Sequence, residues 1–353
     1  MVLPTTYFAA LILLIGSMLC WGSWANTQKL AGKWRFEVFY YDYSIGMLLC
    51  AVIAAYTLGQ MAPRELTFSD NLVIAAKRQM AWAVAAGMVF NLANLLLVAA
   101  ISVSGLAVAF PISIGLALVI GTVWSYILNP QGYAPLIFGG ALLVLIAILV
   151  DGFAYSGYLQ AKKAEEVRPL NPDPRAKKKT ARTPGAARGI VLSLVSGLLM
   201  GAFYPMVEIA KAGEVGVAPY GVGILFGAGV FFSSLLYLPF FMNFPVEGEP
   251  LEFTAYLSGK PRQHLLGVAG GIIWMIGGLC NFCAASTPSS VQVGPAVSYA
   301  LGQGATLVSA LWGLLVWNEF KGANERTKML IVVMLVLYVA GLAMISIAPL
   351  RAR

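Results

Sequence analysis

The chain has 353 residues, of which 59% are hydrophobic and only 11% are charged, and its mean hydropathy is +0.80. This composition excludes an ordinary water-soluble domain. Ten spans of about 22 residues would use roughly 220 residues at the length that a bilayer demands. We therefore expect an all-α membrane protein with ten transmembrane helices. Only 15 acidic residues and a single histidine, His264, are present. Few side chains can therefore act as acids, bases or metal ligands, which disfavours a hydrolytic or metal-dependent activity.

Ten apolar runs, each bounded by polar or turn residues, are the predicted membrane spans. The first run has no Lys or Arg before it and continues beyond Cys20, which favours a true helix over a cleaved secretory signal. The predicted spans are 6–28, 39–60, 79–101, 104–128, 134–158, 189–210, 219–242, 264–285, 290–317 and 329–349.

A basic, proline-containing stretch separates the first five spans from the last five. Nine of the 23 Lys and Arg residues lie between Lys162 and Arg188. Such a stretch is typical of a flexible cytoplasmic linker, and it lacks the interleaved aromatic residues that would favour nucleic-acid binding. We therefore predict a first five-helix repeat over 1–160, a basic cytoplasmic linker over 161–188 and a second five-helix repeat over 189–353.

The distribution of positive charge predicts the orientation in the plasma (inner) membrane. The loops after the odd-numbered spans carry 17 Lys and Arg residues, against 6 in the termini and the other loops, and without the linker the difference falls to 8 against 6. Because positive loops stay in the cytoplasm, both termini are expected outside. Five spans in each half mean that the second half crosses the membrane in the opposite direction, as in inverted-repeat transporters.

Similarity between the two halves supports an internal duplication. Four residues of the first span recur in the sixth at an offset of 179, and six residues of the fourth span recur in the ninth at an offset of 189. Each match alone is weak because small and aliphatic residues are common in membrane helices, but two matches in the same order favour duplication. The recurring residues are Leu13, Ser17, Leu19 and Gly22, and then Gly105, Ala107, Val108, Gly115, Leu118 and Val119.

Polar and aromatic side chains within the spans predict a solute pocket. Hydrocarbon offers no hydrogen-bonding partner, so such side chains face a cavity or another helix. They gather in the first, third and fourth spans and in the related sixth, eighth and ninth. Amides both donate and accept, and Trp and Tyr offer flat apolar faces, which suits a small, planar, neutral polar solute. Hydrogen bonding between helices is the alternative for each amide. The predicted substrate-binding residues are Trp21, Trp24, Asn91, Asn94, Tyr204, Trp274, Asn281 and Gln303.

Several short motifs occur in the same order as in a known transporter family. They include Asp42-Tyr43-Ser44-Ile45, Thr57-Leu58-Gly59-Gln60, Val119-Ile120-Gly121-Thr122 and Trp317-Asn318-Glu319-Phe320. In these motifs the chain resembles the ureide permeases of the drug/metabolite transporter (DMT) superfamily, over most of its length outside the linker. The resemblance implies two inverted five-helix repeats and proton-coupled import of allantoin, related cyclic ureides or nucleobases. Other branches of the superfamily leave a sugar permease or a metabolite or drug exporter as the alternative.

Proton symport requires a group that changes charge during the transport cycle. Glu208 follows Pro205, which can kink its helix and open space beside the carboxyl group. Asp42 begins the Asp-Tyr-Ser motif of the resemblance. We predict Glu208 and then Asp42 as the proton-coupling residues, with simple pairing to Lys211 as the alternative for Glu208.

A membrane enzyme acting on lipid or isoprenoid is the competing class. Such enzymes usually hold metal-diphosphate with paired carboxylates, whereas the four Asp residues here are isolated in sequence. Cys280 and Cys283 have the spacing of a redox or zinc pair but no further ligands nearby, which favours helix packing. We expect a transporter that is not an enzyme and uses no cofactor or metal. Its expected partners are a small solute, protons and the lipid bilayer, without nucleic acid, and it is expected to be a monomer or homodimer.

Overall fold

The computed structural model describes residues 1–61, 66–166, 186–245, 249–291 and 293–351, and no β-strand occurs in these ranges. Ten segments within them are helical, long and apolar enough to cross a membrane. They coincide with the ten predicted spans apart from shifts of a few residues at their ends. The chain is therefore an all-α, multi-pass membrane protein, as the composition predicts.

Short helices lie between some of the membrane-spanning helices. The first half contains α1 (Tyr7–Ser23), α2 (Ala25–Ala31), α3 (Phe36–Tyr56), α4 (Phe68–Ile74), α5 (Lys77–Ser104), α6 (Leu106–Leu128) and α7 (Ala134–Glu166). The second half contains α8 (Ala186–Lys211), α9 (Pro219–Asn243), α10 (Thr254–Leu257), α11 (Pro261–Ala284), η1 (Ser289–Val291), α12 (Pro295–Gly302), α13 (Ala305–Leu311), η2 (Trp312–Val316) and α14 (Glu325–Arg351).

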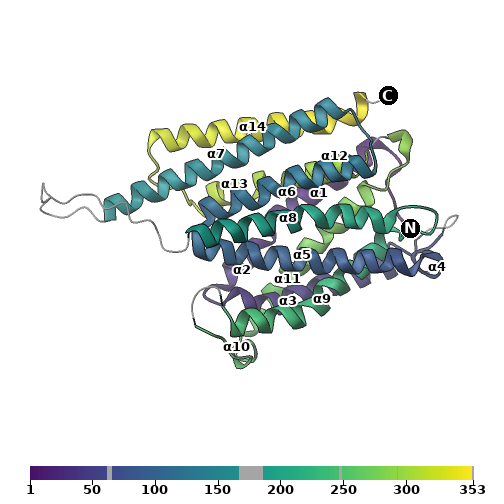
Figure 1. Cartoon of the computed structure of the whole chain (residues 1–353), viewed down its shortest axis with the longest axis horizontal. Helices are drawn as coiled ribbons and strands as arrows, with labels where there is room; N and C mark the ends of the chain where they lie inside the picture. Colours follow the sequence, from purple (N-terminus) through teal and green to yellow (C-terminus); the bar gives the residue numbers. More distant parts are fainter. Residues whose placement is uncertain (62–65, 167–185, 246–248, 292, 352–353) are drawn as a thin grey trace, which may run out of the picture.

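The long helices run roughly along one common direction and define two ends of the molecule (Figure 1). α7 ends and α8 begins at one end, which we call the linker side. α1 begins and α14 ends at the other, which we call the terminus side. α1 runs from the terminus side to the linker side and α8 runs the opposite way, so the second half crosses inverted relative to the first.

Two boundaries differ from the sequence prediction. α7 continues to Glu166 and α8 begins at Ala186, so both ends of the predicted linker are helical, while 167–185 lies outside the described residues. α3 begins at Phe36, three residues before the predicted span, so Asp42 lies well inside the helix.

Glycine contacts between neighbouring helices occur in pairs related by the two halves. Gly46 and Gly271 allow α3 and α11 to approach so closely that an added Cβ would clash with the backbone of Val268 or Tyr43. Gly229 and Gly87 have the same role between α9 and α5, against Val84 and Phe226. The four residues of the α3–α11 contact each lie 183 or 184 positions from their counterparts in the α9–α5 contact. This exchange of contacts is the pattern that an inverted repeat predicts.

A second pair of contacts follows the offset found in the sequence. Gly22 of α1 lies against Ala305 and Val308, and Gly201 of α8 lies against Ala117 and Ile120. The two glycines are 179 positions apart, and their partners are 188 positions apart. α1 therefore packs on α13 as α8 packs on α6.

The predicted spans 6–28 and 290–317 are each interrupted in the structure. The first is divided at Trp24 into α1 and α2. The ninth is divided at Gln303, where the Gly304 N–H donates to the Leu301 carbonyl at 2.8 Å instead of continuing the α-helical pattern. Glycines on both sides of Gln303 lower the helix propensity at this position. Interrupted helices near the middle of the membrane commonly mark substrate sites in transporters.

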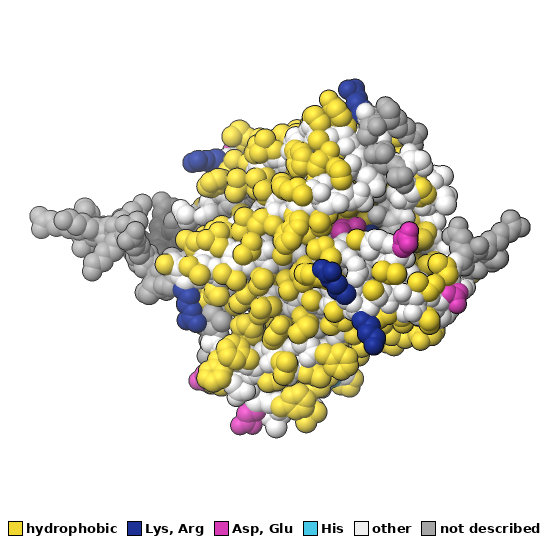
Figure 2. Space-filling model, turned by 45° about the vertical axis from the view of Figure 1, so that its right-hand side comes forward, with side chains coloured by type: hydrophobic (Ala, Val, Ile, Leu, Met, Phe, Trp, Pro, Cys, Tyr) yellow, Lys and Arg dark blue, Asp and Glu magenta, His cyan; other side chains and the backbone are white. Residues whose placement is uncertain are grey.

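Hydrophobic side chains cover most of the outer face shown in Figure 2, and charged side chains on it are few. Large apolar residues such as Phe232 and Leu236 of α9 and Val332 and Val336 of α14 are more than half exposed. An exposed apolar area of this extent would be unfavourable in water and suits contact with lipid.

Candidate functional site

A central cavity of about 170 Å³ lies where helices of the two halves meet. One ordered water needs only about 10–15 Å³ of such space, so the cavity is an order of magnitude larger than a water site. It contains both helix interruptions, at Trp24 and Gln303. Its lining residues are Trp21, Trp24, Ala25, Phe90, Asn94, Leu97, Phe110, Ile114, Met200, Phe203, Trp274, Gly302, Gln303, Ala305, Thr306 and Ser309.

Several pairs of positions related by the offsets contribute to the lining of the central cavity. The offset of 179 relates Trp21 to Met200 and Trp24 to Phe203, and all four line it. The offset of 184 relates Phe90 to Trp274, whose ring centroids are 4.4 Å apart. The cavity therefore lies between the two halves of the chain, and in transporters built from inverted repeats this is the usual position of the substrate site.

Five of the eight predicted substrate-binding residues share this cavity: Trp21, Trp24, Asn94, Trp274 and Gln303. The indoles of Trp21 and Trp274 stack with centroids 5.4 Å apart, and Trp21 Nε1 donates to the Trp274 carbonyl at 3.1 Å. Asn94 Nδ2 donates to the Tyr40 hydroxyl at 3.1 Å, which fixes the amide. The cavity thus offers flat aromatic faces with amide groups beside them.

Asn91 is placed elsewhere. Its Nδ2 faces α9, where it donates to the Val230 carbonyl at 3.1 Å and lies 2.7 Å from Ser233 Oγ. Asn91 is fully buried and does not line the central cavity. It forms the hydrogen bond between helices that the sequence left open as the alternative.

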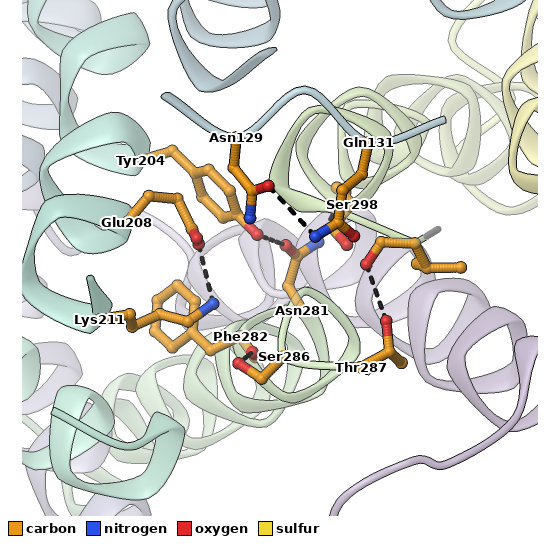
Figure 3. Close-up of polar contacts among 11 residues, drawn as sticks. Asn129, Gln131, Tyr204, Glu208, Lys211, Asn281, Phe282, Ser286, Thr287 and Ser298 are labelled. Atoms are coloured by element: carbon orange, nitrogen blue, oxygen red, sulfur yellow. Dashed lines mark hydrogen bonds and ion pairs between the residues drawn. The ribbon is translucent and has the colours of Figure 1, made fainter. Parts of the chain in front are cut away.

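Tyr204 and Asn281 close the terminus side of the central cavity instead of lining it. The Tyr204 hydroxyl donates to Asn281 Oδ1 at 2.5 Å (Figure 3). Asn281 Nδ2 donates to the Ser298 carbonyl at 3.0 Å and to Ser17 Oγ at 3.2 Å. Tyr299 is also fully buried, and its hydroxyl donates to the Ala117 carbonyl at 3.1 Å. We call Tyr204, Asn281 and Tyr299 the terminus-side lock.

A second cavity, of about 270 Å³, adjoins the central one on the linker side. The two share Ala25, Phe110, Thr306 and Ser309 in their linings. The charged residues that line this linker-side cavity are Lys29, Asp151 and Glu319. Lys29 Nζ lies 2.6 Å from Glu319 Oε1 and 4.3 Å from the centre of the Trp317 ring. Lys29 and Glu319 are 44% and 37% exposed, so the cavity reaches the surface.

Comparisons with known proteins agree with the family suggested by the motifs. The family model for ureide permeases matches residues 39–184. Ureide permease 1 of Arabidopsis thaliana is 25% identical over 351 residues, covering 87% of each chain. Ureide permease 2 of the same plant is 25% identical and covers 95% of this chain and 96% of its own. The chain is thus similar to the ureide permeases over most of its length.

The fold of this chain also occurs among solved structures. One structure, described only as "Crystal structure of protein", aligns with 97% of this chain and 98% of its own at a TM-score of 0.60 and 16% sequence identity. At that identity the likeness concerns the fold alone.

Glu208, the first predicted proton-coupling residue, is buried on the terminus side. Its Oε1 lies 2.9 Å from Lys211 Nζ, and the two side chains are only 8% and 10% exposed (Figure 3). Neither residue lines the central or the linker-side cavity. The structure thus contains the Lys211 pairing that the sequence left open, and a coupling role for Glu208 stays a prediction.

Asp42, the second predicted coupling residue, is also engaged. Its Oδ2 lies 2.7 Å from His264 Nδ1, and its Oδ1 accepts a 2.8 Å hydrogen bond from the Tyr256 hydroxyl. Burial and this hydrogen bond raise the pKa of Tyr256, which keeps its hydroxyl a donor. Asp42 lines neither cavity. These contacts hold α3, α10 and α11 together, and a coupling role for Asp42 stays a prediction.

Several cavity residues were not predicted from the sequence. Phe90, Phe110 and Phe203 supply aromatic faces, and Thr306 and Ser309 supply hydroxyl groups. Isolated Phe residues in an apolar span carry no signal that separates a cavity wall from a packed core. The repeat alignment would have indicated Phe203, because it is the counterpart of Trp24. Among the described residues, no cluster of three or more His, Cys, Asp or Glu could hold a metal ion.

Proposed function

We propose that the protein is a secondary transporter that imports a ureide or a nucleobase across the plasma membrane together with protons. The central cavity is its solute site. The observation that carries this proposal is the combination of three tryptophans and two amides, Trp21, Trp24, Trp274, Asn94 and Gln303, around one cavity at the repeat interface.

The chemistry of the cavity supports a planar polar solute. Ureides and nucleobases are flat molecules with several amide-like donors and acceptors. Aromatic rings can stack on their faces, and each stacked ring contributes about 1–3 kcal/mol in comparable base-binding sites. Asn94 and Gln303 supply both donors and acceptors at the edge. The names of the Arabidopsis relatives, ureide permeases 1 and 2, support the same substrate class.

The proposed direction and energy source follow from topology and sequence. We place the linker side in the cytoplasm because most of the positive charge lies in its loops. The cavities open to that side in this conformation, which suits the release step of an importer. No Walker-type phosphate loop occurs in the sequence, so an ion gradient is the proposed driving force.

A thermal-shift titration of the purified protein tests the solute class. We expect allantoin or uracil to stabilise the fold and glucose to have no effect, since a ligand at 100 times its Kd adds about 2.7 kcal/mol to the stability. Trp274→Ala should weaken binding at least about tenfold through loss of stacking. Phe232→Ala, which removes an exposed ring of α9, is the matched control and should bind normally. Stabilisation by glucose alone would overturn the proposed substrate class.

A further inference from the structure

Asp151 is the carboxylate of the linker-side cavity that has no hydrogen bond or ion pair within the part of the chain that the structure describes. It lies within the membrane-spanning part of α7, in its linker-side half. Gly152 and Tyr155 of the same helix line the cavity beside it. Asp42 and Glu208, in contrast, are both paired and line neither cavity.

The charged and titratable groups around Asp151 come from four directions. Tyr155 is on its own helix, Tyr338 approaches from α14, Glu319 follows η2 and Lys29 is on α2. α6 contributes Phe110 and Pro111, which are uncharged. Because Lys29 is already paired with Glu319, the ionised Asp151 leaves the cavity with one excess negative charge.

We infer that Asp151 is the group that binds the transported proton. The inference rests on the proposed function, because it names the coupling residue of that transport cycle. It replaces neither the solute site nor its lining.

The physical basis is the cost of sealing a charge away from water. In the present conformation Asp151 lines the linker-side cavity, which reaches the surface at Lys29 and Glu319, so water has a route to its carboxylate. Closing the cavity would strand an unpaired negative charge in a medium of low dielectric constant, which is strongly unfavourable. A proton bound to a carboxylate oxygen of Asp151 removes that charge, and no other bond changes. Solute and proton therefore occupy the closed carrier together.

Lys29 provides the second way to compensate Asp151. Glu319 is partly exposed, so it can turn to solvent and release Lys29 to the same cavity. Pairing of Lys29 with Asp151 neutralises the carboxylate without a proton, which allows the empty carrier to return. The carboxylate is thus compensated by a proton in the loaded carrier and by Lys29 in the empty one.

Proteoliposomes containing wild type, Asp151→Asn, Asp42→Asn and Glu208→Gln test this assignment. Wild type should accumulate allantoin or uracil when the interior is alkaline. Asp151→Asn should lose all accumulation, reaching only equal concentrations on the two sides, yet keep solute exchange. The other two variants should still accumulate solute. Accumulation by Asp151→Asn, its selective loss in Glu208→Gln or Asp42→Asn, or accumulation driven by a sodium gradient instead of a pH gradient would overturn the assignment.

A readout without solute separates failure of this inference from failure of the proposed function. Ser309 lines both cavities, so a thiol reagent can reach Ser309→Cys when the linker side is open. The four native cysteines are replaced by serine in this background. Labelling should fall as the pH is lowered, because a proton on Asp151 adds a second way to close the cavity beside the Lys29 pairing, and Asp151→Asn should remove this dependence. Asp151→Glu should restore it, which also controls for misfolding. A pH dependence that persists in Asp151→Asn would overturn the inference even if the protein transports a different solute.

Discussion

The terminus side and the linker side of the central cavity carry different side chains at positions related by the offsets between the two halves. On the terminus side, Tyr204, Asn281 and Tyr299 fill the space and hydrogen-bond to one another or to neighbouring backbone. The offsets of 179, 184 and 188 place Ala25, Leu97 and Pro111 at the related positions on the linker side. All three line a cavity there.

This difference explains why the cavities reach the surface on the linker side. A duplicated frame could close at either end, and the side chains at three related positions determine which end is sealed in this conformation. On the terminus side, the side chains of Tyr204, Tyr299 and Asn281 fill the space and form the lock. On the linker side, the smaller side chains of Ala25, Leu97 and Pro111 leave space. Transport through the central cavity requires the terminus-side lock to separate, because it blocks the path from the other side.

The largest expected effect comes from giving the linker side the residues of the lock. Ala25→Tyr should fill the central cavity and reduce allantoin or uracil affinity at least about 100-fold, equivalent to about 2.7 kcal/mol. Equilibrium binding to the purified variant measures this. Leu198→Tyr, which adds a similar side chain at a half-exposed position of α8, is the control and should bind normally. Unchanged affinity in Ala25→Tyr would show that the solute binds elsewhere.

The ion pairs on the two sides should differ in their contribution to stability. Glu208→Gln leaves the buried Lys211 without its partner and should lower the free energy of unfolding by about 3 kcal/mol. Glu319→Gln breaks a pair that is more than one third exposed and should cost less than about 1 kcal/mol. Denaturation of both variants in detergent measures the difference. Equal losses would contradict the contrast between a sealed and an open side.

A smaller difference should separate the amides of the two sides. Asn281→Leu removes three hydrogen bonds, which at about 0.6 kcal/mol each within a membrane protein sum to about 2 kcal/mol. Asn94→Leu removes one hydrogen bond, to Tyr40, and should cost about 0.6 kcal/mol. The two losses are measured side by side by denaturation. A greater loss for Asn94→Leu would show that the lock does not stabilise this conformation.

The sequence predicts the ten spans well because long apolar runs and charged loops are strong physical signals. It predicts the central cavity in part. Polar and amphipathic side chains are costly in hydrocarbon unless they face a cavity or a hydrogen-bonding partner. This rule identified five of the lining residues: Trp21, Trp24, Trp274, Asn94 and Gln303.

The same rule could not distinguish residues that line the central cavity from residues of the terminus-side lock. Tyr204 and Asn281 are as polar as the cavity residues, but they satisfy each other, and this depends on how α8 and α11 approach. Asp151 was equally hard to place, because the neighbourhood of its carboxyl group is formed by Lys29 and Glu319, which are distant in sequence. The repeat offsets connect these regions only once the glycine contacts fix the alignment.

A crystal structure of the protein with 5-bromouracil tests whether the central cavity is the solute site, because the anomalous signal of bromine reports where the solute lies. We predict a single bromine peak inside the central cavity, with the base stacked against Trp21, Trp24 or Trp274 and its edge at Asn94 or Gln303. A bromine site outside this cavity, with the cavity itself free of the base, would contradict the account.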